Sequence, residues 1–273
     1  TGVTDSFYKQ IVSNPSLLLN IYDEITLGTT FNFSYTPRPR AKNRLLYNFG
    51  IDLSGNVAGL VTKNKGYRQS KIFGAPFAQF VKLDLGTNYT RRLNNGVEWA
   101  NRLELGIGVP YANSRLLPFA KQYTIGGASS IRGFSTRSLG PGTYKPTAED
   151  QRFYQIIGGD FRLLANTELR KPLSKLLSAA VFVDAGNIWT KDTLMFGPQS
   201  KLTKDWFKEI AVAGGVGLRV DLTFLLLRFD LGMPFRKPYL PDGQRWVFNQ
   251  IDFRSGPWRR ENLVFNIAIG LPF

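Results

Sequence analysis

A single arginine, Arg132, lies in a stretch of small residues that runs from Gly126 to Phe134 and reads GGASSIRGF. The stretch follows an apolar run and begins a long segment rich in Gly, Ser and Pro. A guanidinium is planar and binds two carboxylates in a fixed geometry. Arg132 is therefore a candidate for binding a phosphate, solvent or a pair of carboxylates.

A phosphate-binding loop is the weakest of these alternatives. The stretch lacks the Gly-Lys-Ser/Thr ending of a P-loop, and no helical pattern follows it. A flexible loop with a solvated arginine and an arginine held by carboxylates both remain open.

Two later segments supply the carboxylates. NTELRKPL (166–173) places Glu168 on the polar face of a strand, and VFVDAGNIW (181–189) places Asp184 on the face opposite to its valines. If the polar face lines a barrel, two neighbouring carboxylates repel each other, and a cation between them relieves that cost. The geometry permits Arg132 to insert there, with Gly133 allowing a sharp turn. An ordinary ion pair of Asp184 with Arg170 or Arg219 is the equal alternative.

The composition limits the chemistry of the chain. Its 273 residues include no cysteine and no histidine, which excludes cysteine nucleophiles, cysteine zinc sites and Ser-His-Asp triads. We therefore expect no enzyme, no metal and no cofactor. A net charge of +15 favours an anionic partner such as a phosphate-bearing membrane surface, and 14% aromatic residues is high for a soluble domain.

Apolar and polar residues alternate with a period of two along much of the chain, which predicts strands. The ten predicted strands are 24–36, 45–57, 81–89, 101–109, 115–125, 160–170, 178–190, 210–222, 224–233 and 263–273. Many are about ten residues long, the length that a tilted strand needs to cross a bilayer. Residues 1–23 show no alternation and are expected to form an irregular, partly helical connection.

The polar faces of these strands favour a membrane barrel over a soluble sandwich. They are rich in Gly, Asn, Ser and opposed charges, as a barrel lumen is, and aromatic residues gather near strand ends. The loops alternate between short and long from residue 90 onward for the most part, although the links at 61–75 and 91–96 break the pattern. We expect an all-β, antiparallel transmembrane barrel over 24–273, whose long loop at 126–159 folds inward.

In chain order, SSIRGF, NTELRKPL, FVDAGNIW, GGVGLRVDL and LLRFDLGMPF resemble the C-terminal barrel of the BamA/TamA superfamily of outer-membrane assembly proteins, the bacterial surface antigen family. Its two most specific motifs match Ile131-Arg132-Gly133-Phe134 and Phe182-Val183-Asp184-Ala185-Gly186. The resemblance covers the chain from about residue 24 and is strongest over 117–273.

The resemblance implies a place for each of these residues. Family barrels have sixteen strands, so the ten predicted here would be strands seven to sixteen, with the first six strands and the periplasmic domains outside this chain. The loop arginine is held inside the barrel by acidic residues that match Glu168 and Asp184, and Gly186 is expected to be a third acceptor of this lock. The last strand carries an assembly signal and a weak seam, which match Phe265, Ile267, Ile269, Gly270 and Phe273.

The resemblance also implies a function. We expect an integral protein of the bacterial outer membrane that inserts nascent outer-membrane proteins through a weak lateral seam. Its partners would be these nascent proteins, outer-membrane lipid or lipopolysaccharide, and accessory assembly subunits, with no nucleic acid. The alternatives are a two-partner secretion pore of the same superfamily and a porin-like structural barrel. A soluble sandwich is the remaining alternative.

Overall fold

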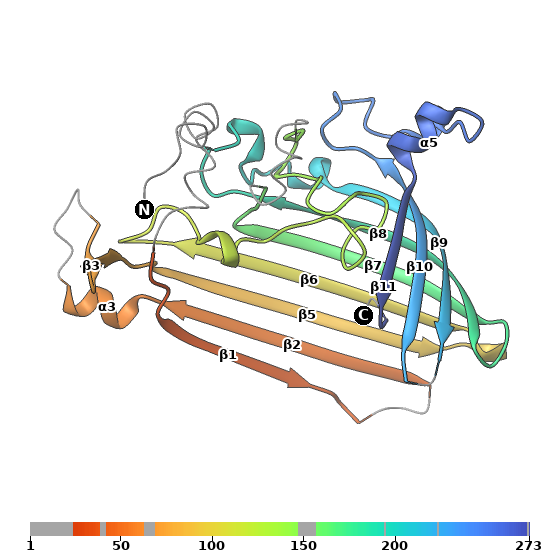
Figure 1. Cartoon of the computed structure of the whole chain (residues 1–273), viewed down its shortest axis with the longest axis horizontal. Helices are drawn as coiled ribbons and strands as arrows, with labels where there is room; N and C mark the ends of the chain where they lie inside the picture. Colours follow the sequence, from red (N-terminus) through yellow and green to blue (C-terminus); the bar gives the residue numbers. More distant parts are fainter. Residues whose placement is uncertain are drawn as a thin grey trace, which may run out of the picture.

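The computed structural model describes residues 24–38, 42–62, 69–146, 157–193, 195–222, 224–271 and 273. Nine antiparallel strands form one sheet in the order β1-β2-β5-β6-β7-β8-β9-β10-β11 (Figure 1). Their bounds are β1 Gly28–Tyr35, β2 Asn43–Ser54, β5 Phe80–Arg92, β6 Glu98–Pro110, β7 Phe161–Pro172, β8 Leu177–Trp189, β9 Ala211–Asp221, β10 Leu226–Arg236 and β11 Val264–Ile269. The predicted fold class is confirmed, and the predicted connection at 1–23 lies outside the described residues.

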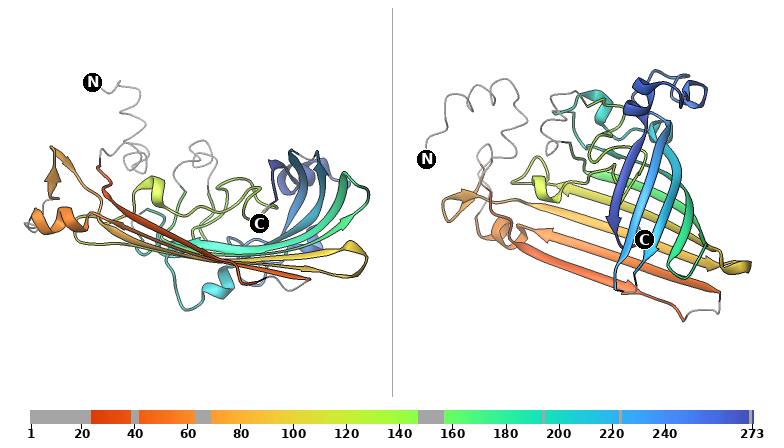
Figure 2. Two further views of the ribbon diagram at one scale, coloured as in Figure 1. Left: turned by 90° about the horizontal axis from the view of Figure 1, so that it is seen from below. Right: turned by 45° about the vertical axis from the view of Figure 1, so that its right-hand side comes forward.

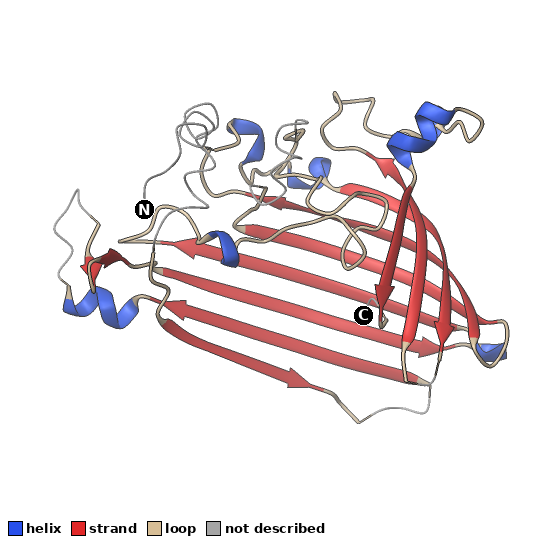
Figure 3. Ribbon diagram, in the orientation of Figure 1, coloured by secondary structure: helices blue, strands red, loops and turns tan. Residues whose placement is uncertain are grey.

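Short elements occupy the connections, as Figure 3 shows. β3 (Lys71–Ile72) and β4 (Ala75–Pro76) form a two-stranded hairpin. The two helices are α3 (Asn56–Val61) and α5 (Gly256–Asn262). Single 3-10 turns are η1 Asn94–Gly96, η2 Phe119–Lys121, η3 Pro198–Ser200, η4 Trp206–Glu209 and η5 Phe248–Gln250. Among the described residues, no helix is long and apolar enough to cross a membrane.

The sheet exposes its apolar face and buries its polar face. Outward side chains such as Phe31, Val181 and Ile267 are each about 60% exposed, whereas Glu168 and Asp184 are fully buried on the other face. Water would make this arrangement costly, and lipid makes it favourable, because the apolar groups then face hydrocarbon. The burial pattern therefore excludes the soluble sandwich.

The connections alternate strictly between the two rims of the sheet. Short turns at 36–42, 93–97, 173–176 and 222–225 share the short-turn rim, and long connections at 55–79, 111–160, 190–210 and 237–263 share the long-loop rim. In outer-membrane barrels the short turns are periplasmic and the long loops extracellular. The links at 61–75 and 91–96, which broke the predicted alternation of short and long loops, therefore fit it in the structure.

The predicted strand at 115–125 does not form, and this error caused those irregularities. The segment instead lies along the inner wall, where Leu117 and Tyr123 sit over Gly108 and Gly106 of β6. A Cβ on either glycine would approach these side chains to 2.4 Å, so only glycine leaves them room. Leu117, Tyr123 and Ile125 occupy alternate positions of the predicted strand and are buried, but the 3-10 turn η2 interrupts the segment between them. The inward connection is thus longer than the predicted 126–159.

The described sheet curls but stays open. Figure 2 shows the connection between β6 and β7 on the concave side of the sheet, and β10 and β11 curving over that side. Strands β1 and β11 are the two edges, and they do not pair with each other in the described part of the chain. The concave face and the inward connection together enclose the candidate site.

Candidate functional site

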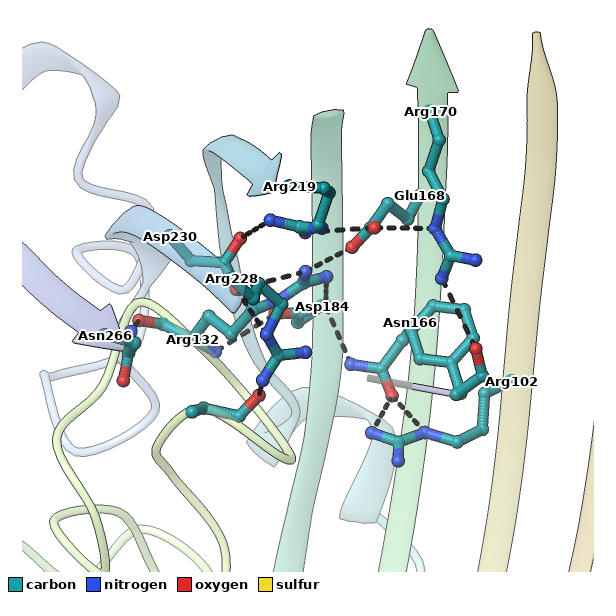
Figure 4. A network of polar contacts seen from close by, with 12 residues as sticks. Arg102, Arg132, Asn166, Glu168, Arg170, Asp184, Arg219, Arg228, Asp230 and Asn266 are labelled. Carbon is teal, nitrogen blue, oxygen red and sulfur yellow. Dashed lines mark hydrogen bonds and ion pairs between the residues drawn. The ribbon is translucent and has the colours of Figure 1, made fainter. Parts of the chain in front are cut away.

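Arg132 lies between two carboxylates on the concave side. Its backbone N–H, Nε and Nη2 donate to Asp184 at 3.0, 2.8 and 2.8 Å, and its Nη1 donates to Glu168. All three side chains are at most 1% exposed. The structure therefore brings together the arginine and the two acids that the sequence singled out, with Asp184 held in a bidentate pair (Figure 4).

Strand register explains why the two acids converge. In the β7–β8 pair Asn166 lies opposite Asp184 and Glu168 lies opposite Phe182, so both acids project to the concave side. Asn166 Nδ2 also donates to Asp184 Oδ1 at 2.7 Å. The Arg132 guanidinium is 3.6 Å from the centre of the Phe182 ring, which adds a cation–π contact. The neighbouring strands β7 and β8 thus supply both acceptor carboxylates.

A third acid, Asp230 of β10, extends this site and was not predicted. Arg219 of β9 connects it to Glu168, with ion pairs of 2.6 Å to Asp230 and 3.0 Å to Glu168. Asp230 also lies 3.8 Å from Arg132, and Arg170 pairs with Glu168 at 2.8 Å. Asp230 is on the polar face of its predicted strand, which was the available signal. Arg219 does not pair with Asp184, so that alternative is wrong.

These buried charges form what we call the lock network. Its members are Arg132, Asn166, Glu168, Arg170, Asp184, Arg219, Arg228 and Asp230. Burial alone would lower the pKa of Arg132, but the hydrogen bonds and charges of Asp184 and Glu168 outweigh it and raise the pKa above its usual range. The arginine therefore stays charged at any physiological pH.

The backbone of the loop is also held by the barrel wall. Arg228 of β10 donates to the Ala128 carbonyl at 2.6 Å, and Asn266 of β11 donates to the Arg132 carbonyl at 2.9 Å. The last strand of the sheet therefore contacts the loop arginine directly.

The neighbours of Arg132 in the motif pack the loop in place. Ile131 is fully buried and Phe134 is 6% exposed. They share an apolar cluster with Tyr123, Ile125, Leu139, Leu164, Ile188, Ala211 and Ala213. Gly133 lies against β9 and β10, where a Cβ would be 2.6 Å from Ala213 Cβ and from the Met233 carbonyl oxygen. Glycine is required there because nothing larger fits.

Gly186 plays a different part from the one predicted. No hydrogen bond joins it to the loop among the described contacts, and a Cβ on it would be 2.3 Å from the Leu163 carbonyl oxygen and 3.2 Å from Ile125 Cδ1. It therefore provides space for the loop core and accepts nothing from Arg132.

The terminal-strand residues divide into two groups. Phe265, Ile267 and Ile269 are exposed on the outward face, and the strand ends there, because Gly270 follows with a φ of +83°. Phe273 does not continue this face. Its ring lies 5.1 Å from the Arg102 guanidinium carbon and 5.4 Å from that of Arg170, so it turns to the concave side. The outward apolar face of the last strand therefore ends at Ile269, before the predicted end at Phe273.

The lock network contains cations, carboxylates and an amide, groups whose hydrogen bonds and ion pairs suit the holding of a loop. No group of metal-ligating side chains occurs in the described residues. The porin-like alternative predicts an open lumen with no loop docked inside. The docked loop therefore argues against it.

A family model for the Omp85 superfamily domain matches residues 66–270. Among curated proteins, the outer membrane protein assembly factor BamA of Neisseria meningitidis serogroup B is 28% identical over 95 residues, which cover 33% of this chain and 11% of that protein. The matched part of this chain therefore spans about a tenth of that relative's length.

Two solved structures match most of this chain at low sequence identity. BamA from Haemophilus ducreyi lacking POTRA domains 1-3 matches with a TM-score of 0.47 and 16% identity, over 90% of this chain and 54% of that one. CdiB from Acinetobacter baumannii matches with a TM-score of 0.38 and 13% identity, over 89% and 41%.

Proposed function

Because the chain belongs to the Omp85 superfamily, we propose that it acts in an assembly factor that helps nascent outer-membrane proteins fold into the membrane. The protein is integral to the outer membrane, in keeping with its family and with the apolar outward face of its sheet. The proposed partners are nascent outer-membrane proteins, with accessory assembly subunits beside them.

The edge of β11 is the observation that carries this proposal. β11 is the shortest strand of the nine-stranded sheet and pairs with β10 only from Val264 to Ile269. A strand of six residues offers few N–H and C=O groups to a neighbour along its other edge, so the seam that the resemblance implies there would be weak. A nascent strand would add to this edge.

In this mechanism no covalent chemistry is needed. Strand pairing in the bilayer releases free energy, and the protein lowers the barrier by offering a template edge. Arg132, Glu168 and Asp184 would hold the inward loop while β11 is engaged. The bond from Asn266 of β11 to the Arg132 carbonyl supports a link between the lock network and this edge.

The test is insertion of a radiolabelled outer-membrane protein into vesicles that contain the natural full-length protein. We expect Arg132→Ala to slow insertion, because the loop loses its anchor. Arg115→Ala is the matched control, since Arg115 is an exposed arginine of the same connection. Insertion at the wild-type rate with Arg132→Ala would refute the role of the lock network.

The same vesicles separate assembly from secretion. An assembly factor leaves its substrate in the membrane, resistant to carbonate extraction. A secretion pore of the superfamily would deliver the substrate across the membrane in soluble form, and that result would replace the proposal.

A further inference from the structure

An apolar groove of about 330 Å³ lies on the outward face of the sheet, close to the long-loop rim. Its floor comes from β5, β6 and β7, and its cover comes from the connection between β8 and β9. Lining side chains include Leu83, Leu105, Ile107, Leu163, Leu202 and Trp206. The groove is outside the lock network and faces the membrane.

The β8–β9 connection and the β6–β7 connection lie on opposite sides of the sheet. Figure 2 shows η4, in cyan, on the convex side of the sheet, opposite the inward loop. Two contacts hold it there. Trp206 packs edge to face on Trp189 with ring centres 6.4 Å apart, and the Trp189 indole N–H donates to the Glu209 carboxylate at 2.5 Å. The cover of the groove is therefore a built element of the outward face.

This connection carries apolar side chains that line the groove and exposed lysines next to them in the chain. Leu202 and Trp206 line the groove, while Lys201, Lys204 and Lys208 are exposed beside them. Lys208 is neutralised by Asp205 at 2.9 Å. Glu209 is engaged by Trp189, and Arg162, which also lines the groove, pairs with Glu104 at 2.7 Å. Among the described ion pairs, Lys201 and Lys204 beside the groove have no acidic partner.

An apolar groove edged by two cations fits a lipid with acyl chains and an anionic headgroup. Each cation near an anionic membrane surface contributes to binding, and tryptophan favours the interfacial level where headgroup and chain meet. The groove lies near the long-loop rim, which is extracellular in outer-membrane barrels. The groove would therefore face the outer leaflet of the outer membrane, whose lipids are phosphorylated glycolipids.

We propose that this groove binds one acyl chain of a phosphate-bearing glycolipid of the outer leaflet, with Lys201 and Lys204 binding its phosphate. Such a lipid would join β5–β7 to the β8–β9 connection and order the long-loop rim. The inference depends on the membrane orientation of the barrel and is independent of the assembly activity.

Native mass spectrometry of the delipidated, full-length protein in a neutral detergent tests this proposal. Lipid A, phosphatidylglycerol and phosphatidylethanolamine are titrated separately. We expect lipid A to bind most tightly, and Lys201→Glu with Lys204→Glu to weaken it by about tenfold or more, because two attractive charges become repulsive. Leu105→Trp, which adds bulk to the groove floor, should also displace the lipid.

Lys171→Glu with Lys175→Glu is the matched control, because these exposed lysines lie at the short-turn rim. Heat-modifiable gel mobility reports whether each barrel is folded, and Lys201→Gln with Lys204→Gln replaces the charge reversal if that variant does not fold. Equal binding of all three lipids, a preference for phosphatidylglycerol, or equal losses in control and test variants would each overturn the proposal.

Discussion

At the scale of single residues, Arg132 is a buried side chain that is held by two carboxylates. Its guanidinium has Asp184 and Glu168 as partners, and burial removes water as a substitute. Deleting one partner of a buried ion pair costs more than the pair contributes, because the remaining charges stay buried without compensation. The residue therefore decides both the position of the loop and the stability around it.

Replacing Arg132 with alanine should lower the free energy of unfolding by about 3–5 kcal/mol, because buried Asp184 loses its ion pair and keeps only the Asn166 amide, whereas Glu168 still pairs with Arg170 and Arg219. Urea unfolding in vesicles, followed by heat-modifiable mobility, measures the change. In a double-mutant cycle with Asp184→Asn, the two changes should couple by about 0.5–3 kcal/mol. Strictly additive effects would contradict the bidentate pair.

Gly133 makes an independent prediction. A valine there would collide with Ala213 and the Met233 carbonyl, so Gly133→Val should destabilise the protein by about 1–3 kcal/mol or expel the loop. Protease cleavage of the loop, which we expect to be protected in the wild type, reports expulsion. Gly256→Ala is the control, since its nearest neighbour would be 4.0 Å away. Equal protection of Gly133→Val and wild type would argue against close packing.

At the scale of elements, the ends of β7 and β8 are joined through Asp160. This residue is 4% exposed, and its Oδ2 accepts from the Lys191 backbone N–H at 2.7 Å. Burial raises its pKa to about 6, and the charge of Asp192 acts in the same direction. Between pH 4 and 6 the folded state therefore binds a proton that the unfolded chain has released.

It follows that stability falls as pH rises through that window, by about 3 kcal/mol from this one group. Asp160→Asn should remove this part of the pH dependence, because an amide does not titrate. Urea midpoints at pH 4 and pH 8 for both proteins measure it. An unchanged pH dependence in Asp160→Asn would assign the effect to other groups.

At the scale of the whole molecule, the inverted faces of the sheet set the environment in which it is stable. Side chains such as Val181 and Phe265 would be a liability in water, and they become favourable contacts in hydrocarbon. The polar face can be charged because the inward loop and the opposing strands supply counter-charges.

A charge on the outward face should therefore be costly. Val181→Arg, in the middle of β8, should destabilise the protein in vesicles by about 2–4 kcal/mol, and Leu176→Arg in a short turn by about 0–1 kcal/mol. Urea unfolding in vesicles compares the two. Equal small costs would indicate that the face contacts water instead of lipid.

The sequence by itself determined the strands and their faces. A period of two follows from the pleat of a strand, so nine of the ten predicted strands and the inward direction of Glu168 and Asp184 were readable locally. The motif around Arg132 indicated carboxylate partners, and the resemblance to a family favoured Glu168 and Asp184 over an exposed arginine. Segment 115–125 misled, because its apolar residues Leu117, Tyr123 and Ile125 match the same period although a 3-10 turn separates them.

Only the tertiary structure decided which distant groups meet. Asp230 and Asn266 reach the loop because β10 and β11 curve over the concave side, and Phe273 turns inward beside Arg102. The lipid groove likewise needs the β8–β9 connection on the convex side. Periodicity reports the face of each residue, but curvature and loop direction depend on contacts between segments far apart in the chain.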